Sequence, residues 1–248
     1  MEHNAIPSSI AGTALREHRA LVTWRDTTNY AAGIGDTNGL FFNDESTDGL
    51  IAHPVFPTAL TWPVIEHLEQ YVPDPNFPLE LLRRQVHYTE HLVLHRPIRP
   101  GAALTISGKI HAVQPHRAGS VCVLRFDASD DGGVPVFTEF IGGMLRGVAC
   151  EGACDAEYAP PGRIDIEQFP GILKETHIPV PRLLPYIYDG CSRIHFPIHT
   201  SPAFAHMVGL PGIIVQGTAV LALAVSALVE SELGGNAASV RELACLFT

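Results

Sequence analysis

Residues 197–224, PIHTSPAFAHMVGLPGIIVQGTAVLALA, carry the strongest structural signal in this chain. They place a lone histidine, His199, in a loop punctuated by proline and serine. A Leu-Pro-Gly turn follows, and the apolar segment after it predicts a long buried helix over residues 213–233. The apolar positions that recur at helical spacing, and that are expected to face the core, are Ile214, Leu221, Val225 and Leu228.

The same stretch contains parts that suit chemistry on an acyl thioester. A histidine can take up or release a proton near neutral pH, so His199 is a candidate acid/base. A glycine at a helix start, here Gly217, lets backbone N–H groups approach a carbonyl oxygen closely. Both residues also have a structural interpretation, because His199 can hydrogen-bond its own loop and Gly217 can serve helix packing.

The composition limits the class of protein. The chain has 248 residues, 46% of them apolar, and a net charge of −10, which argues against nucleic acid as the main partner. The longest apolar stretch, residues 213–229, contains polar residues and is shorter than a membrane span, and the N-terminus predicts no secretory signal. Five cysteines without a paired framework favour a reducing, cytoplasmic location.

The first half of the chain predicts helices followed by an antiparallel sheet. A short helix is expected over residues 29–35, with Thr27 or Thr28 as its N-cap, and a second helix is expected to begin after Pro63. Strand-like segments separated by glycine-containing turns then follow, at residues 85–94, 103–113, 120–128 and 136–148. A helix laid on such a meander is an α+β architecture.

The second half of the chain repeats this plan in shortened form. Residues 151–171 are rich in proline and glycine and predict a linker between units at 1–150 and 172–248. The expected elements of the second unit are a strand at 173–180, a short helix at 182–189, the long helix and a final strand at 240–247. Three strands of the first unit have no counterpart in the second unit. Either the second unit is truncated, or another chain or the first half covers the edge of its sheet.

Two stretches resemble the MaoC-like hydratase/dehydratase family, also called hydratase type 2. The family motif runs from a tyrosine through Ser-Gly-Asp-x-Asn-Pro-aliphatic-His to a glycine-containing helix start. Tyr188, residues 192–199 (SRIHFPIH) and residues 213–217 (IIVQG) match it in the second half. Tyr30 and residues 34–41 (IGDTNGLF) match it in the first half.

The resemblance implies a double hot-dog fold, in which an antiparallel sheet wraps a long helix in each of two units, with the second unit apparently truncated here. It implies addition of water to an enoyl thioester, or the reverse reaction, in fatty acid or polyketide metabolism. The substrate would be carried on CoA or an acyl-carrier protein, with no cofactor, and the chain would form a homo-oligomer, a dimer. The substrate-binding residues that it implies are Ser192, Pro197, Gly212 and Gln216.

The chain departs from the motif at its acid/base positions. Ile194 stands where the family has aspartate, while the first half keeps Asp36 and Asn38 but has Phe41 at the histidine. A substitute acid/base is therefore expected, and His195 and Asp189 are the nearest in sequence.

A metal site is not expected, because His195 and His199 lie in a proline-containing loop and not on one face of a helix. The even spacing of His87, His91 and His95 predicts one solvated or half-buried strand face.

Other functions stay open. A MaoC-like protein without a full dyad could bind an acyl thioester without catalysis, or pair with an active subunit. A hot-dog thioesterase would instead need a base aimed at a water near the thioester carbon.

Overall fold

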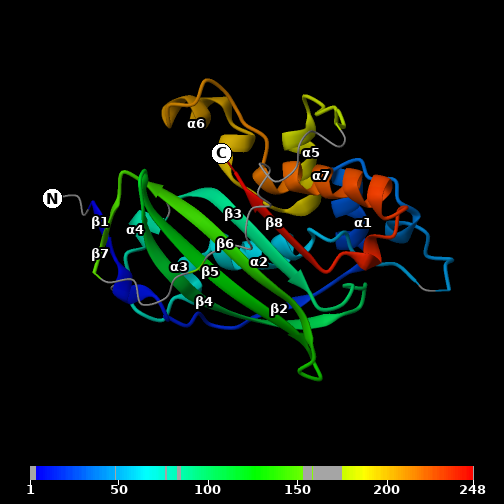
Figure 1. Cartoon of the computed structure of the whole chain (residues 1–248), viewed down its shortest axis with the longest axis horizontal. Helices are drawn as coiled ribbons and strands as arrows, with labels where there is room; N and C mark the ends of the chain where they lie inside the picture. Colours follow the sequence, from blue (N-terminus) through cyan, green and yellow to red (C-terminus); the bar gives the residue numbers. More distant parts are fainter. Residues whose placement is uncertain are drawn as a thin grey trace, which may run out of the picture.

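A six-stranded antiparallel sheet forms the centre of the molecule (Figure 1). The computed structural model describes residues 4–47, 49–75, 77–82, 85–152, 158 and 175–247. The strand order is β2-β4-β5-β6-β3-β8. The strands are β2 (His18–Leu21), β3 (Val86–Leu94), β4 (Ala103–His116), β5 (Gly119–Asp130), β6 (Pro135–Arg146) and β8 (Glu242–Leu246). A separate parallel pair joins β1 (Ala5–Pro7) to β7 (Ala149–Glu151), and the short helix η1 (Ser8–Ile10) follows β1.

The four predicted long strands are present, and β4, β5 and β6 form an antiparallel meander, whereas β3 pairs with β6 and not with β4. The turn from β4 to β5 requires Gly119, whose φ is 145° and whose added Cβ would lie 2.1 Å from the carbonyl oxygen of Leu145.

A β-bulge in β3, between His87 and Thr89, changes which side chains share a face. It brings His87 to the side of Glu90, whereas His91 stacks on Phe140 on the opposite face. The expectation that His87 and His91 share a face is therefore wrong, because a bulge shifts the alternation by one residue.

Three helices lie behind the sheet in Figure 1: α2 (Pro57–Glu66), α3 (Leu68–Tyr71) and α4 (Leu79–Leu82). The prediction that the regular helix begins after Pro63 is wrong, because α2 begins at Pro57 and contains Pro63. Pro57 suits a first helical turn. Pro63 removes one helical hydrogen bond, and packing of the apolar helix against the sheet offsets that loss.

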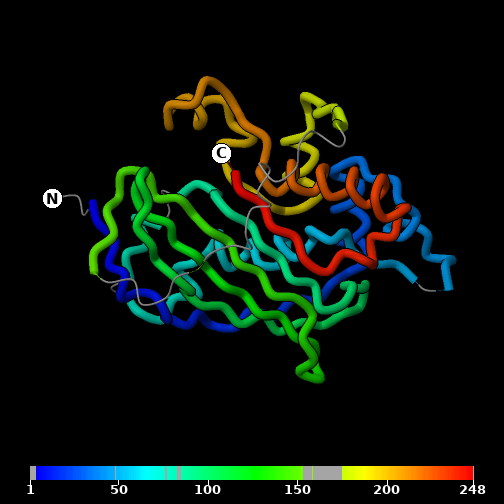
Figure 2. Tube along the Cα trace, in the orientation of Figure 1, coloured from blue at the N-terminus to red at the C-terminus, as the bar shows by residue number. Residues whose placement is uncertain are grey.

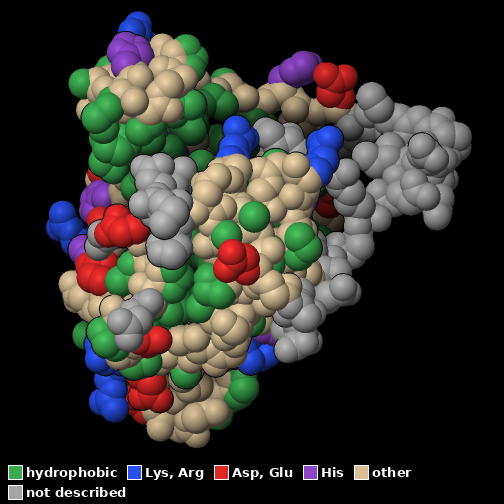
Figure 3. Space-filling model, turned by 90° about the vertical axis from the view of Figure 1, so that its left-hand side faces the viewer, with side chains coloured by type: hydrophobic (Ala, Val, Ile, Leu, Met, Phe, Trp, Pro, Cys, Tyr) green, Lys and Arg blue, Asp and Glu red, His purple; other side chains and the backbone are tan. Residues whose placement is uncertain are grey.

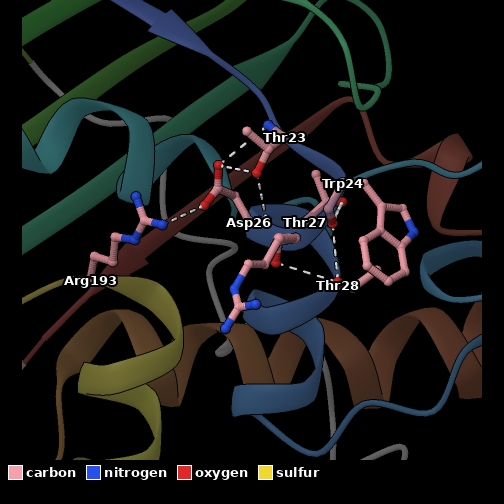
Figure 4. Close-up of polar contacts among 7 residues, drawn as sticks. Thr23, Trp24, Asp26, Thr27, Thr28 and Arg193 are labelled. Carbon is pink, nitrogen blue, oxygen red and sulfur yellow. Dashed lines mark hydrogen bonds and ion pairs between the residues drawn. The ribbon is translucent and has the colours of Figure 1, made fainter.

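Helix α1 (Trp24–Gly33) begins with a capping box (Figure 4). Thr23 Oγ1 accepts from the N–H of Asp26 at 3.1 Å, and Asp26 Oδ2 accepts from the N–H of Thr23 at 3.3 Å. Thr27 and Thr28, predicted as caps, lie inside the helix, where both hydroxyls donate to the carbonyl of Trp24. The short helix η2 (Gly39–Phe41) follows α1.

The second half contributes helices and one strand. Its elements are α5 (Leu184–Ser192), η4 (Pro197–His199), α6 (Pro202–Met207), α7 (Gly217–Glu232), η5 (Ala237–Ser239) and β8. The predicted short helix, long helix and final strand are confirmed, although α7 begins at Gly217 and not at residue 213. The strand predicted at 173–180 is wrong for residues 175–180, and residues 173 and 174 lie outside the described part. Apart from Tyr158, so do residues 153–171 of the predicted linker.

The two halves share one sheet and one core. Strand β8, red in Figure 2, pairs antiparallel with β3 along its length. The first half thus covers one edge of β8, and β8 ends the sheet among the described residues. The two motif tyrosines meet where α1 packs on α5, and the hydroxyl of Tyr188 donates to that of Tyr30 at 3.0 Å. The chain therefore has the α+β double hot-dog fold, with each half completing the other.

The crossing of α1 and α5 yields a first prediction. A Cβ at Gly33 would lie 2.6 Å from the Cβ of Cys191, so Gly33→Ala should force the helices apart and lower the free energy of unfolding by about 1–3 kcal/mol. Gly190→Ala, in α5 with open space around it, should instead raise stability by about 0.5–1 kcal/mol. Urea unfolding of both variants checks this, and equal effects would contradict the close packing.

The apolar stripe predicted for the long helix is only half buried. Leu221 and Val225 lie in the core, but Ile214 and Leu228 are exposed, Leu228 by 58%, so the core prediction is wrong for these two. The reason is that the second half supplies one strand to its helix, whereas the first half supplies a sheet. The lobe that holds α6 rises above the sheet, with hydrophobic side chains at its surface in Figure 3 and Met207 72% exposed.

Candidate functional site

The end of α5 shapes the loop that carries His199. Arg193 has a left-handed backbone, with a φ of 61°, and its guanidinium pairs with Asp26 at 3.1 Å (Figure 4). The hydroxyl of Ser192 donates to the carbonyl of Tyr188 and accepts from the N–H of Ile194. These bonds turn Ile194 into the core, where its side chain is 3% exposed. Ser192, predicted to bind substrate, is therefore engaged in holding the loop.

His199 ends η4 and is fixed by one hydrogen bond. Its Nδ1 lies 2.9 Å from the carbonyl oxygen of Ile214. Because a carbonyl only accepts, Nδ1 carries the proton in the neutral ring, and Nε2 keeps its lone pair. Burial lowers the pKa of His199 below 6.5, an effect that the Ile214 carbonyl and the charge of Asp189 partly oppose. His199 is thus neutral at pH 7, with Nε2 available as a base.

Asp189 and His195 form a pair beside this histidine. Asp189 Oδ2 lies 2.9 Å from His195 Nδ1, which orients the carboxylate. The charge of Asp189 also acts to raise the pKa of His199. The structure thus brings Asp189, His195 and His199 to one end of α5 and its loop.

The start of α7 holds Gly217, the residue predicted to supply a backbone donor. Gln216 precedes Gly217 and is buried, and its Nε2 donates to the carbonyl of Pro185 at 3.0 Å. Its Oε1 has no hydrogen-bond partner among the described residues. The ring of Phe247 lies against Gly217, 3.1 Å from the position of an added Cβ, so a larger residue there would displace it.

The other two predicted substrate-binding residues lie in the segments on either side of α6. Pro197 begins η4 and is exposed, and Gly212 has open space around its Cα in the turn before α7.

Asp36 lies at the other end of α7. Its Oδ1 accepts from the N–H of Asn38, and the Asn38 amide donates to the carbonyl of Gly235, just beyond the end of the helix. His199 contacts Ile214, before the helix begins. A helix of 16 residues is about 24 Å long, so the structure does not bring Asp36 and His199 together.

A histidine that the motif did not predict lies near Asp36. Burial lowers the pKa of His53 to about 4, which Asp36 partly opposes. Both ring nitrogens of His53 are engaged, by the N–H of Val55 and by the hydroxyl of Ser226. No short-range sequence signal marks His53, because Ser226 is far along the chain.

Two negative findings apply to the described residues. They contain no group of three or more histidine, cysteine, aspartate or glutamate side chains placed to hold a metal ion. None of their helices is long and apolar enough to cross a membrane.

Comparisons with known proteins match both halves. The family model described as FAS1-like, dehydratase domain region, matches residues 9–139, just over half of the chain, and the model described as MaoC like domain matches residues 178–248. Among curated relatives, a UPF0336 protein of Streptomyces avermitilis is 29% identical over 114 residues, which cover 44% of this chain and 73% of that protein.

Two solved structures share the fold at low sequence identity. A MaoC-like dehydratase from Phytophthora capsici matches with a TM-score of 0.74 and 20% identity, covering 96% of this chain and 82% of that chain. The peroxisomal multifunctional enzyme type 2 from Drosophila melanogaster matches with a TM-score of 0.68 and 19% identity, covering 96% of this chain and 41% of that chain. Both likenesses confirm the predicted architecture.

Proposed function

Because this chain belongs to the MaoC-like dehydratase family, we propose that it adds water to an enoyl thioester or removes water from a 3-hydroxyacyl thioester. The observation that carries the proposal is the position of His199, whose ring hydrogen-bonds the carbonyl of Ile214, three residues before α7 begins. His199, with its unprotonated Nε2, and the N–H of Gly217 therefore both lie at the N-terminal end of α7.

The chemistry follows from these two groups. In the dehydration direction, His199 Nε2 takes the proton from the α-carbon while the bond from C3 to its hydroxyl breaks. The hydroxyl takes a proton from a second acid, outside these two groups, and leaves as water, and the electron pair of the C–H bond becomes the double bond. The N–H of Gly217 stabilises the negative charge that develops on the thioester oxygen. Hydration is the same step reversed.

Asp189 and His195 tune this histidine in the proposal. The charge of Asp189 acts to raise the pKa of His199 and so strengthens Nε2 as a base. Asp36 is left out of the mechanism, because α7 separates it from His199.

The remaining residues are assigned to binding. Pro197 and Gly212 form the rim over which the thioester would enter, and Gln216 offers its unpartnered Oε1 to a donor on the substrate. Ser192 acts by holding the loop. The acyl group could be carried on CoA or a carrier protein, and self-association as a dimer belongs to the proposal.

Binding without catalysis is the second candidate function. It is favoured by Ile194, which removes the motif aspartate, and by Phe247, which packs on the proposed donor Gly217.

Incubation with crotonyl-CoA tests the proposal. Formation of 3-hydroxybutyryl-CoA is the expected result. Release of free CoA would instead show a thioesterase. Saturable binding without product would support the second candidate function, binding without catalysis. Measuring product and bound ligand in the same samples separates these outcomes.

A further inference from the structure

The outer face of the sheet, the face away from α2 in Figure 1, carries a small hydrophobic cluster separate from the main core. Its buried members are Ala112, Val121, Val123 and Met144. The ring of Phe140, on β6, packs against them, and the ring of His91, on β3, stacks on Phe140 with centroids 5.4 Å apart. The guanidinium of Arg125, on β5, lies 5.4 Å from the centre of the Phe140 ring. Phe140 is thus the centre of an aromatic patch that crosses three strands.

Tyr158 lies on this patch. Its ring stacks on that of Phe140, with centroids 4.7 Å and planes 15° apart, and the ring of His111, on β4, meets it edge-on at 5.7 Å. Tyr158 is half-buried as a result, whereas residues 153–157 and 159–174 on either side of it lie outside the described part of the chain. The rings of β4 and β6 therefore hold this one side chain on the sheet.

The hydroxyl of Tyr158 donates to His91. Its oxygen lies 2.7 Å from His91 Nδ1, and His91 Nε2 lies 2.9 Å from Glu242 Oε1, on β8. Because a carboxylate only accepts, Nε2 of the neutral ring carries the proton, and Nδ1 needs a donor. The phenol can be that donor at pH 7, since burial first, and then the charges of Glu90 and Glu242, raise the pKa of Tyr158. A chain of hydrogen bonds therefore runs from Tyr158 through His91 to Glu242.

Gln114, on β4, binds the backbone of Tyr158. With its amide oriented so that each donor meets an acceptor, its nitrogen lies 3.0 Å from the Tyr158 carbonyl oxygen and its oxygen lies 3.1 Å from the Tyr158 nitrogen. A side-chain amide has the same donor and acceptor as a peptide group, so Gln114 pairs with Tyr158 as a neighbouring strand would. The ring, the hydroxyl and the backbone of Tyr158 are thus each recognised by different side chains.

We propose that the outer face of the sheet carries a binding site for a tyrosine side chain, which Tyr158 occupies and which braces the contact between the two halves of the chain. The residues that form it are His91, His111, Gln114 and Phe140. The brace arises because His91 lies on β3 and Glu242 lies on β8, the strand that joins the second half to the sheet. While β8 is paired, His91 turns its Nε2–H toward Glu242, and Tyr158 supplies the donor that Nδ1 then needs. The inference goes beyond the proposed function and does not depend on it.

Chemical rescue tests the site. Tyr158→Ala should empty it, and p-cresol, which is the tyrosine side chain as a free molecule, should bind in place of the ring. At about 1–10 mM, p-cresol should raise the melting temperature of Tyr158→Ala by more than that of wild type, and saturably. Toluene at the same concentration, which lacks the hydroxyl, should raise it less. Equal shifts in wild type and Tyr158→Ala would overturn the site, and equal shifts by the two compounds would overturn the role of His91.

Hydrogen exchange of the β8 amides tests the brace. Tyr158→Phe keeps the ring but leaves His91 Nδ1 without a donor while β8 is paired with β3. His91 is 7% exposed, so this unsatisfied nitrogen destabilises the paired state more than the state in which β8 has opened. Exchange at residues 242–246 should therefore become about threefold to tenfold faster. Unchanged exchange in Tyr158→Phe would overturn the brace.

Tyr71→Phe is the matched control for this variant. The hydroxyl of Tyr71 lies 2.8 Å from Nδ1 of His18, on β2, at the opposite edge of the sheet from β8. The control removes the same kind of bond between a phenol and a histidine, but away from β8. Exchange at residues 242–246 should stay within about twofold of wild type in Tyr71→Phe. Equal increases in the two variants would show a general loss of stability and overturn the brace.

Discussion

His199→Ala is expected to lower kcat for hydration of crotonyl-CoA by at least about 10²-fold, with little change in KM. General acid/base groups contribute about 10²–10⁴-fold, and KM should hold because Nε2 is needed for proton transfer more than for binding. Steady-state kinetics on purified wild type and variant measure this.

The matched control for this variant is His206→Ala. His206 lies in the same segment, on α6, and its Nε2 lies 3.3 Å from the carbonyl oxygen of Pro211. Its removal should leave kcat within about twofold of wild type. If the two variants had equal rates, His199 would not be the acid/base.

The pH dependence of wild-type activity should also identify His199 as the base. Burial first of all lowers the pKa of His199 from 6.5, so the basic form persists below neutral pH. Activity in the dehydration direction, which uses the unprotonated ring, should therefore persist below neutral pH and fall with a midpoint below pH 6.5, as the ring becomes protonated. If activity instead fell with a midpoint above pH 7, the base would be a group other than His199.

Much of the fold was predictable from local sequence. Alternating β-branched residues and glycine turns located four strands, and the apolar run after Pro211 located α7. The errors arise where tertiary packing outweighs local preference. Pro63 stays inside α2 because that helix is packed against the sheet, and the bulge at His87 reverses a face that even spacing had assigned.

The site was predictable only in part. The motif located His199 and the start of α7, and it showed that Ile194 replaces an aspartate. The approach of Phe247 to Gly217 joins residues distant in the chain, so no local pattern indicated it. The separation of Asp36 from His199 likewise depends on the length of α7.

Restoring the motif aspartate by Ile194→Asp is expected to destabilise the protein by about 3–5 kcal/mol. Ile194 lies in the core, and a carboxylate in its place would be buried without a paired cation. The Ser192 hydroxyl already bonds the backbone N–H of residue 194, which leaves that donor unavailable to the new side chain. Urea unfolding gives the free energy directly.

Ile194→Val separates the effect of charge from that of volume. It keeps an apolar, β-branched side chain and should cost about 0.5–1.5 kcal/mol, the loss for one buried methyl group. If Ile194→Asp were as stable as Ile194→Val and also hydrated crotonyl-CoA faster than wild type, the loop would still be built for the aspartate. The protein would then have lost only one side chain from an otherwise intact dyad site. If the expected destabilisation is found, the loop has repacked around isoleucine, and the second proton must come from elsewhere in the molecule.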